Sequence, residues 1–325
     1  MRSLLAILAG LLLGSGVQAA DVPASLLALD RDGNALLVID PANLQLRHRV
    51  ATGTGPHEVV GSADGRYAYV ANYGTKEVVG DSISIIDLVA GREVERVEVR
   101  PFARPHGLEL VDDKLYFTAE HSRSVARLDL ATRKVDWVMG IGLDVTHMLD
   151  VAPDGRTLYA TSLLSDAVTA VQIGAPGLAK LSTAKLGKHP EGLALAPDGK
   201  TLWVGQNGTG KIAVLDAQTL ALQAELDAGQ YPARVKFTPD GKFALSIDPA
   251  GSELLVIDAA QRQVVKRLHI PGAVLGLLPA ADSRRVFLTL AQSGQLAQVD
   301  LTAMAVERIV DIGRVADGMA WAGPG

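Results

Sequence analysis

Short apolar segments separated by turns recur along most of the chain at a nearly constant interval. Between Pro56 and Asp87, one apolar segment leads to an Asp64-Gly65 turn, a second begins at Tyr67, and a third ends on Asp87. Such segments are rich in Val, Ile and Leu, and they alternate partly between apolar and polar positions. Runs of about four to eight residues with this character are typical of β-strands. The pattern predicts strands throughout and no long amphipathic helix.

The interval is marked by the residue that closes the third segment of each unit. In chain order the marks are Asp40, Asp87, Asp129, Gln172, Asp216, Asp258 and Asp300, which stand 42 to 47 residues apart. A four-stranded propeller blade takes about 40–45 residues. The aspartates precede turns, where such a side chain bonds its own backbone. We therefore interpret them as structural rather than catalytic.

The two ends of the repeat do not match. The first repeated segment, Leu26–Leu29, corresponds to the second strand of a unit, whereas the last one, within residues 316–321, corresponds to a first strand. Pairing the last strand into the first blade would close a ring and remove open sheet edges. The prediction is an all-β, seven-bladed β-propeller of four-stranded antiparallel blades. It occupies one domain, residues 21–325.

A tetrapeptide in the second unit carries a family resemblance. Tyr69-Val70-Ala71-Asn72 is nearly the YVTN motif, and weaker copies stand at residues 159–162, 203–206 and 245–248. The chain from residue 21 onward resembles YVTN-repeat β-propellers and is similar to the YncE-like periplasmic proteins. The resemblance implies the fold. It does not choose a function, because relatives of this architecture include haem-, copper- and nucleic-acid-binding proteins, lactonases and scaffolds.

The N-terminus predicts export. Arg2 is followed by an apolar block, Leu4–Leu13, and then by small residues up to Ala20. This is the pattern of a cleaved signal peptide over residues 1–20, and the block is shorter than the roughly 20 residues that a membrane anchor needs. We expect a periplasmic or secreted protein with no membrane span in the mature chain. With no cysteine, it has no disulfide, thiol nucleophile or covalently attached haem.

The charge gives little indication of a large partner. The net charge is −5 and becomes −6 when Arg2 leaves with the signal. A mildly acidic chain has no general attraction for nucleic acid or anionic lipid. Basic and aromatic residues are also not interleaved as in single-strand binders. We expect a small molecule or a periplasmic protein as the partner, and no nucleic acid.

Candidate chemistry gathers at one repeat position. The first strand of each blade lines the central channel, and we call the residue where the chain enters that strand the channel-mouth position. In chain order these residues are His57, His106, His147, Glu191, Ala233, Leu275 and Asp317. Three imidazoles on consecutive blades, with carboxylates beside them, suit Zn²⁺, Cu²⁺ or Fe²⁺. A metal-free ligand or partner site fits them too, and channel water alone would also satisfy such residues.

Two long connections should open on the same face as His57 and His106. They are residues 73–81 and 100–104, and rigid scaffolds commonly carry function on such loops. Four further polar residues follow nearby strands and are candidate ligand-binding residues, although each is also a common turn residue. They are Asn72, Glu120, His121 and Asn207.

Two functions follow. The main prediction is an exported propeller that binds a small ligand, metal ion or protein partner at its histidine-lined face without turnover. The alternative is a metal-dependent enzyme of lactonase or oxidase type. In the alternative, the three histidines hold the ion and Glu191 or Asp317 acts as a ligand or general base.

Overall fold

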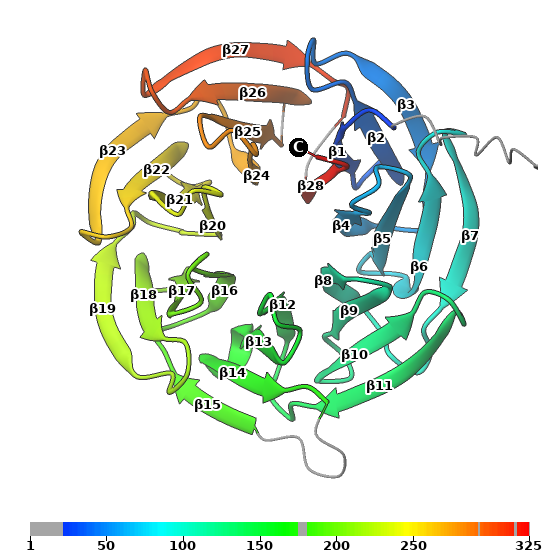
Figure 1. Ribbon diagram of the computed structural model, residues 1–325, viewed down its shortest axis with the longest axis horizontal. Coiled ribbons are helices and arrows are strands. Elements are labelled where there is room, and N and C mark those ends of the chain that lie inside the picture. Colours follow the sequence, from blue (N-terminus) through cyan, green and yellow to red (C-terminus); the bar gives the residue numbers. More distant parts are fainter. Residues whose placement is uncertain (1–21, 175–180, 292, 315–316, 325) are drawn as a thin grey trace, which may run out of the picture.

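Strands grouped in seven sheets surround a central axis in the computed structural model (Figure 1). The structure describes residues 22–174, 181–291, 293–314 and 317–324. The predicted signal peptide, residues 1–20, lies outside the described residues. Each sheet is antiparallel and four-stranded, which confirms the predicted all-β, seven-bladed propeller. Within the described ranges, no helix has the length and apolar character needed to cross a bilayer.

Each sheet is one blade, in which the strands follow one another from the axis outward. Blade 1 contains β28 (Met319–Ala322), β1 (Ser25–Asp30), β2 (Ala35–Ile39) and β3 (Leu46–Ala51). Blade 2 contains β4 (Pro56–Gly61), β5 (Tyr67–Gly74), β6 (Val79–Asp87) and β7 (Arg92–Glu98). Blade 3 contains β8 (Pro105–Val111), β9 (Lys114–Ala119), β10 (Ser124–Asp129) and β11 (Lys134–Gly140). Blade 4 contains β12 (Thr146–Val151), β13 (Thr157–Ser162), β14 (Ala167–Gln172) and β15 (Leu181–Lys185), with a 3₁₀ turn, η1 (Leu163–Ser165).

The other three blades follow the same order. Blade 5 contains β16 (Pro190–Leu195), β17 (Thr201–Gln206), β18 (Lys211–Asp216) and β19 (Leu222–Asp227). Blade 6 contains β20 (Arg234–Phe237), β21 (Phe243–Asp248), β22 (Glu253–Asp258) and β23 (Gln263–His269). Blade 7 contains β24 (Val274–Pro279), β25 (Arg285–Leu290), β26 (Gln295–Asp300) and β27 (Ala305–Asp311).

The ring closes as the unmatched ends predict. Strand β28 pairs antiparallel with β1, with Met319 opposite Ala28 and Ala322 opposite Ser25. The indole N–H of Trp321 in β28 also donates a hydrogen bond of 2.8 Å to the carbonyl of Pro279 in blade 7. Figure 1 shows this strand inside the first blade, beside the N-terminal strands. The two ends of the described chain therefore share one blade.

The core lies between neighbouring blades. All five positions of β2 are buried, whereas β3 at the rim is mostly exposed. A middle strand is covered on both faces by adjacent blades, so it is apolar on both faces rather than alternating. For example, Ile83 in blade 2 and Phe117 in blade 3 belong to one buried cluster. Burying one such side chain contributes about 1.5–3 kcal/mol, so the blades stabilise one another.

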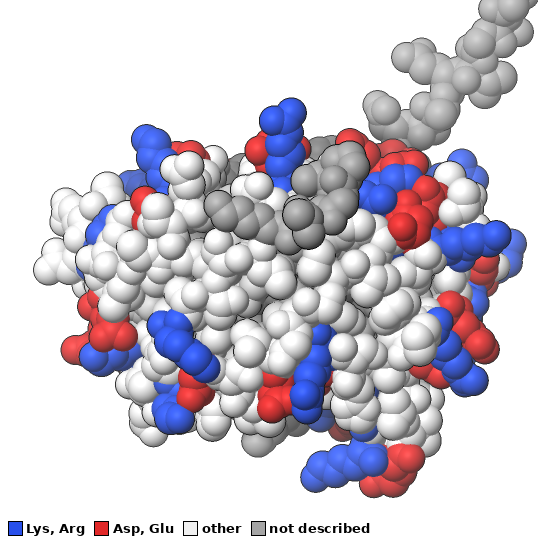
Figure 2. Space-filling model, turned by 90° about the horizontal axis from the view of Figure 1, so that it is seen from below, with Lys and Arg blue, Asp and Glu red and all other residues white. Residues whose placement is uncertain are grey.

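The aspartates of the repeat serve the turns, as predicted. Oδ1 of Asp129 accepts the backbone N–H groups of Ala131 and Thr132, at 2.9 and 2.8 Å. Asp300 accepts those of Thr302 and Ala303 in the same way. These hydrogen bonds, which favour the ionised form, lower the pKa of the Asp300 carboxyl. On the face shown in Figure 2, basic and acidic residues are interspersed.

Candidate functional site

Irregular backbone at the start of the innermost strands positions the channel-mouth residues. The pairing register shifts between Pro56 and Glu58 in β4, and the corresponding shift in β8 follows Pro105. A bulge of this kind re-aims a side chain at the end of a strand. His57 and His106 stand within these two shifts. Strand β12 has the same irregularity after Thr146, at His147.

A glycine lets two histidine-bearing strands approach closely. A Cβ on Gly107 would lie 2.9 Å from the carbonyl oxygen of His147 in the next blade, so a larger residue would push the strands apart. The Thr118 hydroxyl joins the two backbones. It accepts the N–H of Gly107 at 2.8 Å and donates to the carbonyl of His147 at 2.5 Å. Gly107 thus lets the strand that carries His106 lie close to the strand that carries His147.

The structure brings the three predicted histidines together at the channel mouth. The ring centroids of His57 and His106 are 5.1 Å apart, and those of His106 and His147 are 4.0 Å apart. His106, in the middle, is only 4% exposed. Three blades thus form one continuous row of imidazoles.

Each outer histidine of this row has a carboxylate partner. His57 Nδ1 lies 3.0 Å from Oδ2 of Asp317. His147 Nδ1 lies 2.6 Å from Oε1 of Glu120, whose second oxygen accepts a hydrogen bond of 2.5 Å from the hydroxyl of Tyr73. These contacts fix the orientation of both rings. Tyr73 also packs against His57, with ring centroids 4.6 Å apart.

The middle histidine lacks such a partner. Nδ1 of His106 is buried and has no hydrogen-bond partner in the part of the chain that the structure describes. Burial, followed by the nearby His147 and His57, lowers the pKa of His106 well below its usual value. The ring is therefore neutral and keeps a free nitrogen lone pair. Burial also opposes protonation of His147, but the hydrogen bond to Glu120 and the charges of Glu191 and Glu120 raise the pKa of that ring overall.

The group of potential metal donors in the structure differs from the three predicted histidines, because Glu120 takes the place of His57. One donor atom each from His106, Glu120 and His147 lie within 4.8 Å of one another. His57 is paired with Asp317 instead. Glu191 borders the group, with its Oε1 at 4.0 Å from Nε2 of His147.

The remaining predicted ligand-binding residues fall into two groups. Asn207 lies at the site, where its amide donates to Glu191, and His121 lies further out, 3.2 Å from Nε of Arg104. Asn72 does not reach the channel mouth. Its buried amide bonds to Ser82 and Ser84 within its own blade.

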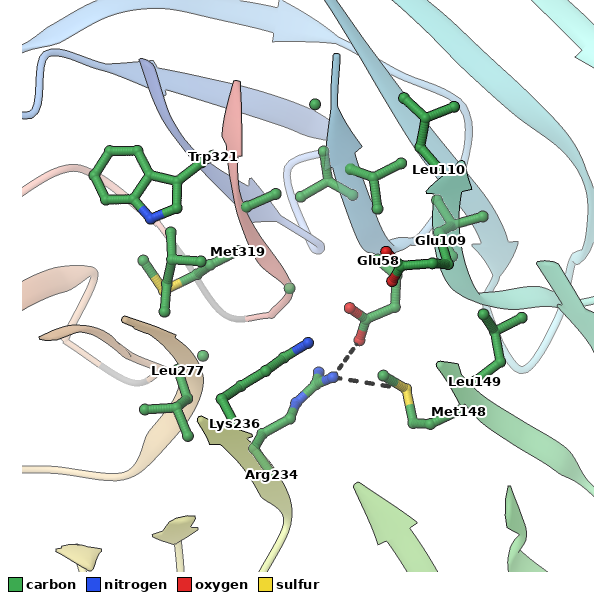
Figure 3. Close-up of a pocket in the computed structure, with 18 residues that line it drawn as sticks. Glu58, Glu109, Leu110, Met148, Leu149, Arg234, Lys236, Leu277, Met319 and Trp321 are labelled. Carbon is green, nitrogen blue, oxygen red and sulfur yellow. Dashed lines mark hydrogen bonds and ion pairs between the residues drawn. The ribbon is translucent and has the colours of Figure 1, made fainter. Parts of the chain in front are cut away.

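Arg234 is a central residue that the repeat alignment does not single out. From β20 in blade 6, its guanidinium reaches Oε1 of Glu58 in blade 2 at 2.5 Å and Oδ1 of Asp317 in blade 1 at 3.1 Å. The three side chains are only 10–13% exposed. Figure 3 shows Arg234 extending toward Glu58 and Met148. The only sequence signal is a basic residue next to the apolar channel-mouth position Ala233.

The contacts of Tyr73 and Arg104 bring the two predicted long connections to the site. Tyr73 is the first residue of the predicted connection 73–81 and lies in β5, one residue before its end, and it contacts His57 and Glu120. The Arg104 guanidinium lies over the Tyr73 ring, 4.7 Å from its centroid. Burial and the Glu120 carboxylate raise the pKa of Tyr73, so its hydroxyl remains a donor.

Comparisons with known proteins place the fold and give one distant sequence relative. No protein-family model matches the chain. Hydrazine synthase subunit beta of Kuenenia stuttgartiensis is 30% identical in an alignment of 256 residues that covers 70% of this chain and 60% of that protein. The chain thus spans less than two thirds of this relative.

Solved structures share the propeller at low identity. A functionally unknown protein from Desulfotomaculum acetoxidans DSM 771 matches 93% of this chain and 99% of its own, with a TM-score of 0.79 at 13% identity. Kuenenia stuttgartiensis hydrazine synthase matches 90% and 99%, with a TM-score of 0.73 at 15% identity. The β-propeller domain of Myceliophteria thermophila Cps50 (Swd1) matches 82% and 89%, with a TM-score of 0.69 at 12% identity. At these identities the matches show the fold alone.

Proposed function

We propose that this protein is a binding module that holds one divalent transition-metal ion, of the Zn²⁺, Cu²⁺ or Fe²⁺ class, at its histidine-lined face. Two observations on His106 carry the proposal. Its buried Nδ1 has no hydrogen-bond partner in the described residues. One of its ring nitrogens lies within 4.8 Å of donor atoms of Glu120 and His147. Leaving a polar atom buried without a partner costs about 1–3 kcal/mol. The neutral His106 ring has one nitrogen with a lone pair, and a bound metal would coordinate that nitrogen.

The donor spacing is compatible with such a site. Bonds of about 2.0–2.2 Å place the donors of a tetrahedral zinc site roughly 3.4 Å apart. The three donor atoms lie within 4.8 Å of one another, so side-chain rotation could bring them into range. Glu120 has two possible uses: it could be a ligand itself, or it could orient His147 through the existing hydrogen bond to Nδ1. Carboxylate–histidine pairs commonly support metal ligands in this way.

Binding without turnover fits the surrounding carboxylates better than the enzyme alternative does. Burial raises the pKa of Asp317, but the hydrogen bond and charge of His57 and the charge of Arg234 lower it overall. A carboxylate held ionised by two partners is a weak general base at neutral pH. Glu191 is similarly engaged by Asn207 and Tyr231. Neither candidate base is free for proton transfer.

Metal content tests the proposal. Untagged protein, stripped with a chelator and then dialysed against Zn²⁺, Cu²⁺ or Fe²⁺, should retain about one equivalent of one of these metals. His106→Ala should reduce its affinity about 10²–10³-fold, since one ligand contributes roughly a quarter of the binding free energy of a four-ligand site. His269→Ala is the matched control, because His269 is exposed on the outermost strand of blade 6. Folded wild-type protein that retains none of the three metals would overturn the proposal.

A second candidate function comes from the sequence relative, whose name describes a subunit. We propose as this alternative that the propeller serves as a non-catalytic subunit of a larger assembly. Gentle purification of the native protein, followed by cross-linking mass spectrometry, should then recover a stoichiometric partner. A monomer at physiological concentration would contradict this candidate and leave metal binding unaffected.

Export remains part of the proposal. A secreted or periplasmic protein should be cleaved after Ala19 or Ala20, so the mature N-terminus should be Ala20 or Asp21. N-terminal sequencing of the native protein measures this directly. An N-terminus at Met1 would contradict cleavage.

A further inference from the structure

A second site on the axis lies beyond the Arg234 contacts. A cavity of about 260 Å³ is lined by residues further along the innermost strands, and the three histidines do not line it. Glu109 and Lys236 lie three positions beyond the channel-mouth positions of their strands, which is about 10 Å along a strand. The cavity and the histidine face are therefore distinct sites.

An acidic and a basic side chain face one another across this cavity. Lys236 comes from β20 in blade 6, and Glu109 comes from β8 in blade 3, as far apart as a ring of seven blades allows. Figure 3 shows both side chains directed into the cavity. Among the described residues, neither side chain forms an ion pair or hydrogen bond. Arg234, by contrast, is already paired with Glu58 and Asp317.

Glu109 and Lys236 have different surroundings. Asp150 in β12 adds a second carboxylate near Glu109, and the backbone N–H of Leu195 donates to it at 2.8 Å. The wall formed by β24 and β28 is apolar, with Leu277, Met319 and Trp321. The cavity thus has an acidic side, a basic side and an apolar wall.

We propose that this cavity binds a small zwitterion of amino-acid size. The ammonium group would face Glu109, the carboxylate would face Lys236, and the carbon chain would lie against the apolar wall. Asp150 does not line the cavity and acts only through its charge near Glu109. Water occupies about 30 Å³ per molecule in the liquid, so the cavity has room for roughly nine waters or an organic molecule of similar heavy-atom count. Lys236 is exposed and Glu109 is partly buried. A simple anion would leave Glu109 without a cation, and a simple cation would make no use of Lys236. A zwitterion pairs with both side chains.

The electrostatics of the acidic side agree with this assignment. Burial, followed by the charge of Asp150, raises the pKa of Glu109 to about 8, against the opposing effect of Lys236. Glu58 and Arg234 also line the cavity but neutralise each other. With this pKa, Glu109 is mostly protonated at neutral pH, and a ligand ammonium group beside it would favour release of that proton and the ionised form.

Calorimetric titration with a matched series tests the proposal. The probes are glycine, β-alanine and 4-aminobutyrate, with butyrate and butylamine as single-charge analogues. At least one zwitterion should bind about tenfold or more tightly than either analogue, the size expected for one charge-assisted hydrogen bond. Glu109→Gln and Lys236→Gln should each weaken that zwitterion about tenfold or more. Glu98→Gln and Lys266→Gln, on exposed outer strands, should leave its affinity unchanged.

Charge reversal provides a second test. Lys236→Glu should lose zwitterion binding and bind butylamine more tightly than the wild type does. The His106→Ala variant should bind the zwitterion as the wild type does, so failure of the metal proposal would not disturb this result. Folded wild-type protein that binds none of the three zwitterions, or binds all five probes equally, would overturn the proposal.

Discussion

The two arcs of the channel mouth have the same four-stranded architecture and different chemistry. Blades 2 to 5, which we call the polar arc, place His57, His106, His147 and Glu191 at this position. Blades 6 and 7, the apolar arc, place Ala233 and Leu275 there. The four-stranded architecture is the same on both arcs. Repetition therefore explains the scaffold, and the departures from it indicate where a site is. The fold alone would not distinguish the arcs.

Arg234 is the cation that connects the two arcs. It extends from the apolar arc to Glu58 and Asp317 on the other side of the channel. If the polar arc depends on this connection, removing the guanidinium should destabilise the protein far more than removing a surface ion pair does. If the arcs are independent, the change should be mild.

Arg234→Met tests that dependence. It leaves two buried carboxylates without their cation, which should lower the free energy of unfolding by about 3–5 kcal/mol. Urea denaturation measures the loss. Arg267→Met is the matched control, because Arg267 pairs with Glu253 at the surface and should lose less than about 1 kcal/mol. Equal losses in the two variants would show that the contact of Arg234 with Glu58 and Asp317 stabilises the fold no more than a surface ion pair does.

Tyr73→Phe tests whether a residue that contacts the proposed metal ligands strengthens metal binding. This prediction rests on the proposed metal site. The change removes the hydroxyl that donates to Glu120, which should weaken metal binding about 10–100-fold. Competition with a chelating dye measures the affinity. Tyr231→Phe is the control, since its hydroxyl contacts Glu191 at 3.4 Å, outside the group of three donors. Unchanged affinity in Tyr73→Phe would remove Glu120 from the site.

Most of the fold could be predicted because its determinants are local and repeated. Aspartates such as Asp129 and Asp300 mark turns through bonds to residues two and three positions ahead, so their spacing reports the blade length. The convergence of His57, His106 and His147 follows from the same logic, because an equivalent position in each blade occupies an equivalent place around the axis.

The partners of those histidines could not be predicted in the same way. Whether Glu120 meets His147 depends on side-chain conformations across two blades, and no period in the sequence records it. Asn72 illustrates the same limit from the other side: the sequence offers it as a candidate ligand-binding residue, but only the structure shows that its amide bonds to serines of its own blade. Arg234 was missed because its partners, at positions 58 and 317, become neighbours only when the channel width is known.

The cavity between Glu109 and Lys236 also has two chemically different sides. The pH dependence of stability in Glu109→Gln tests its acidic side. Glu109 has a pKa of about 8 in the folded protein, against 4.5 as its ordinary value. Between these values the folded chain keeps a proton that the unfolded chain has lost, so stability falls as pH rises and the loss is complete above about pH 8. Glutamine removes that dependence, while Asp150 and Lys236 remain in both proteins.

Thermal melting across pH measures this difference. Glu109→Gln should match the wild type near about pH 5 and melt roughly 2–4 °C higher near about pH 8.5. The sign matters more than the size. A variant that melts lower at high pH would mean that the fold stabilises ionised Glu109. The Glu109 carboxylate would then already have a favourable partner and would not need a ligand ammonium group.

The smallest effect should come from the aspartate turn after the third strand, which every blade except blade 4 has in its sequence. Asp300→Ala removes the acceptor for the backbone N–H groups of Thr302 and Ala303, and the melting temperature should fall by about 1–2 °C. Asp300→Asn is the matched control, because its amide oxygen can still accept them. Neither change should alter metal or zwitterion binding, since this turn follows the third strand of blade 7, away from the axis. A loss of binding in Asp300→Ala alone would mean that the repeated turns, as well as the departures from the repeat, contribute to the site.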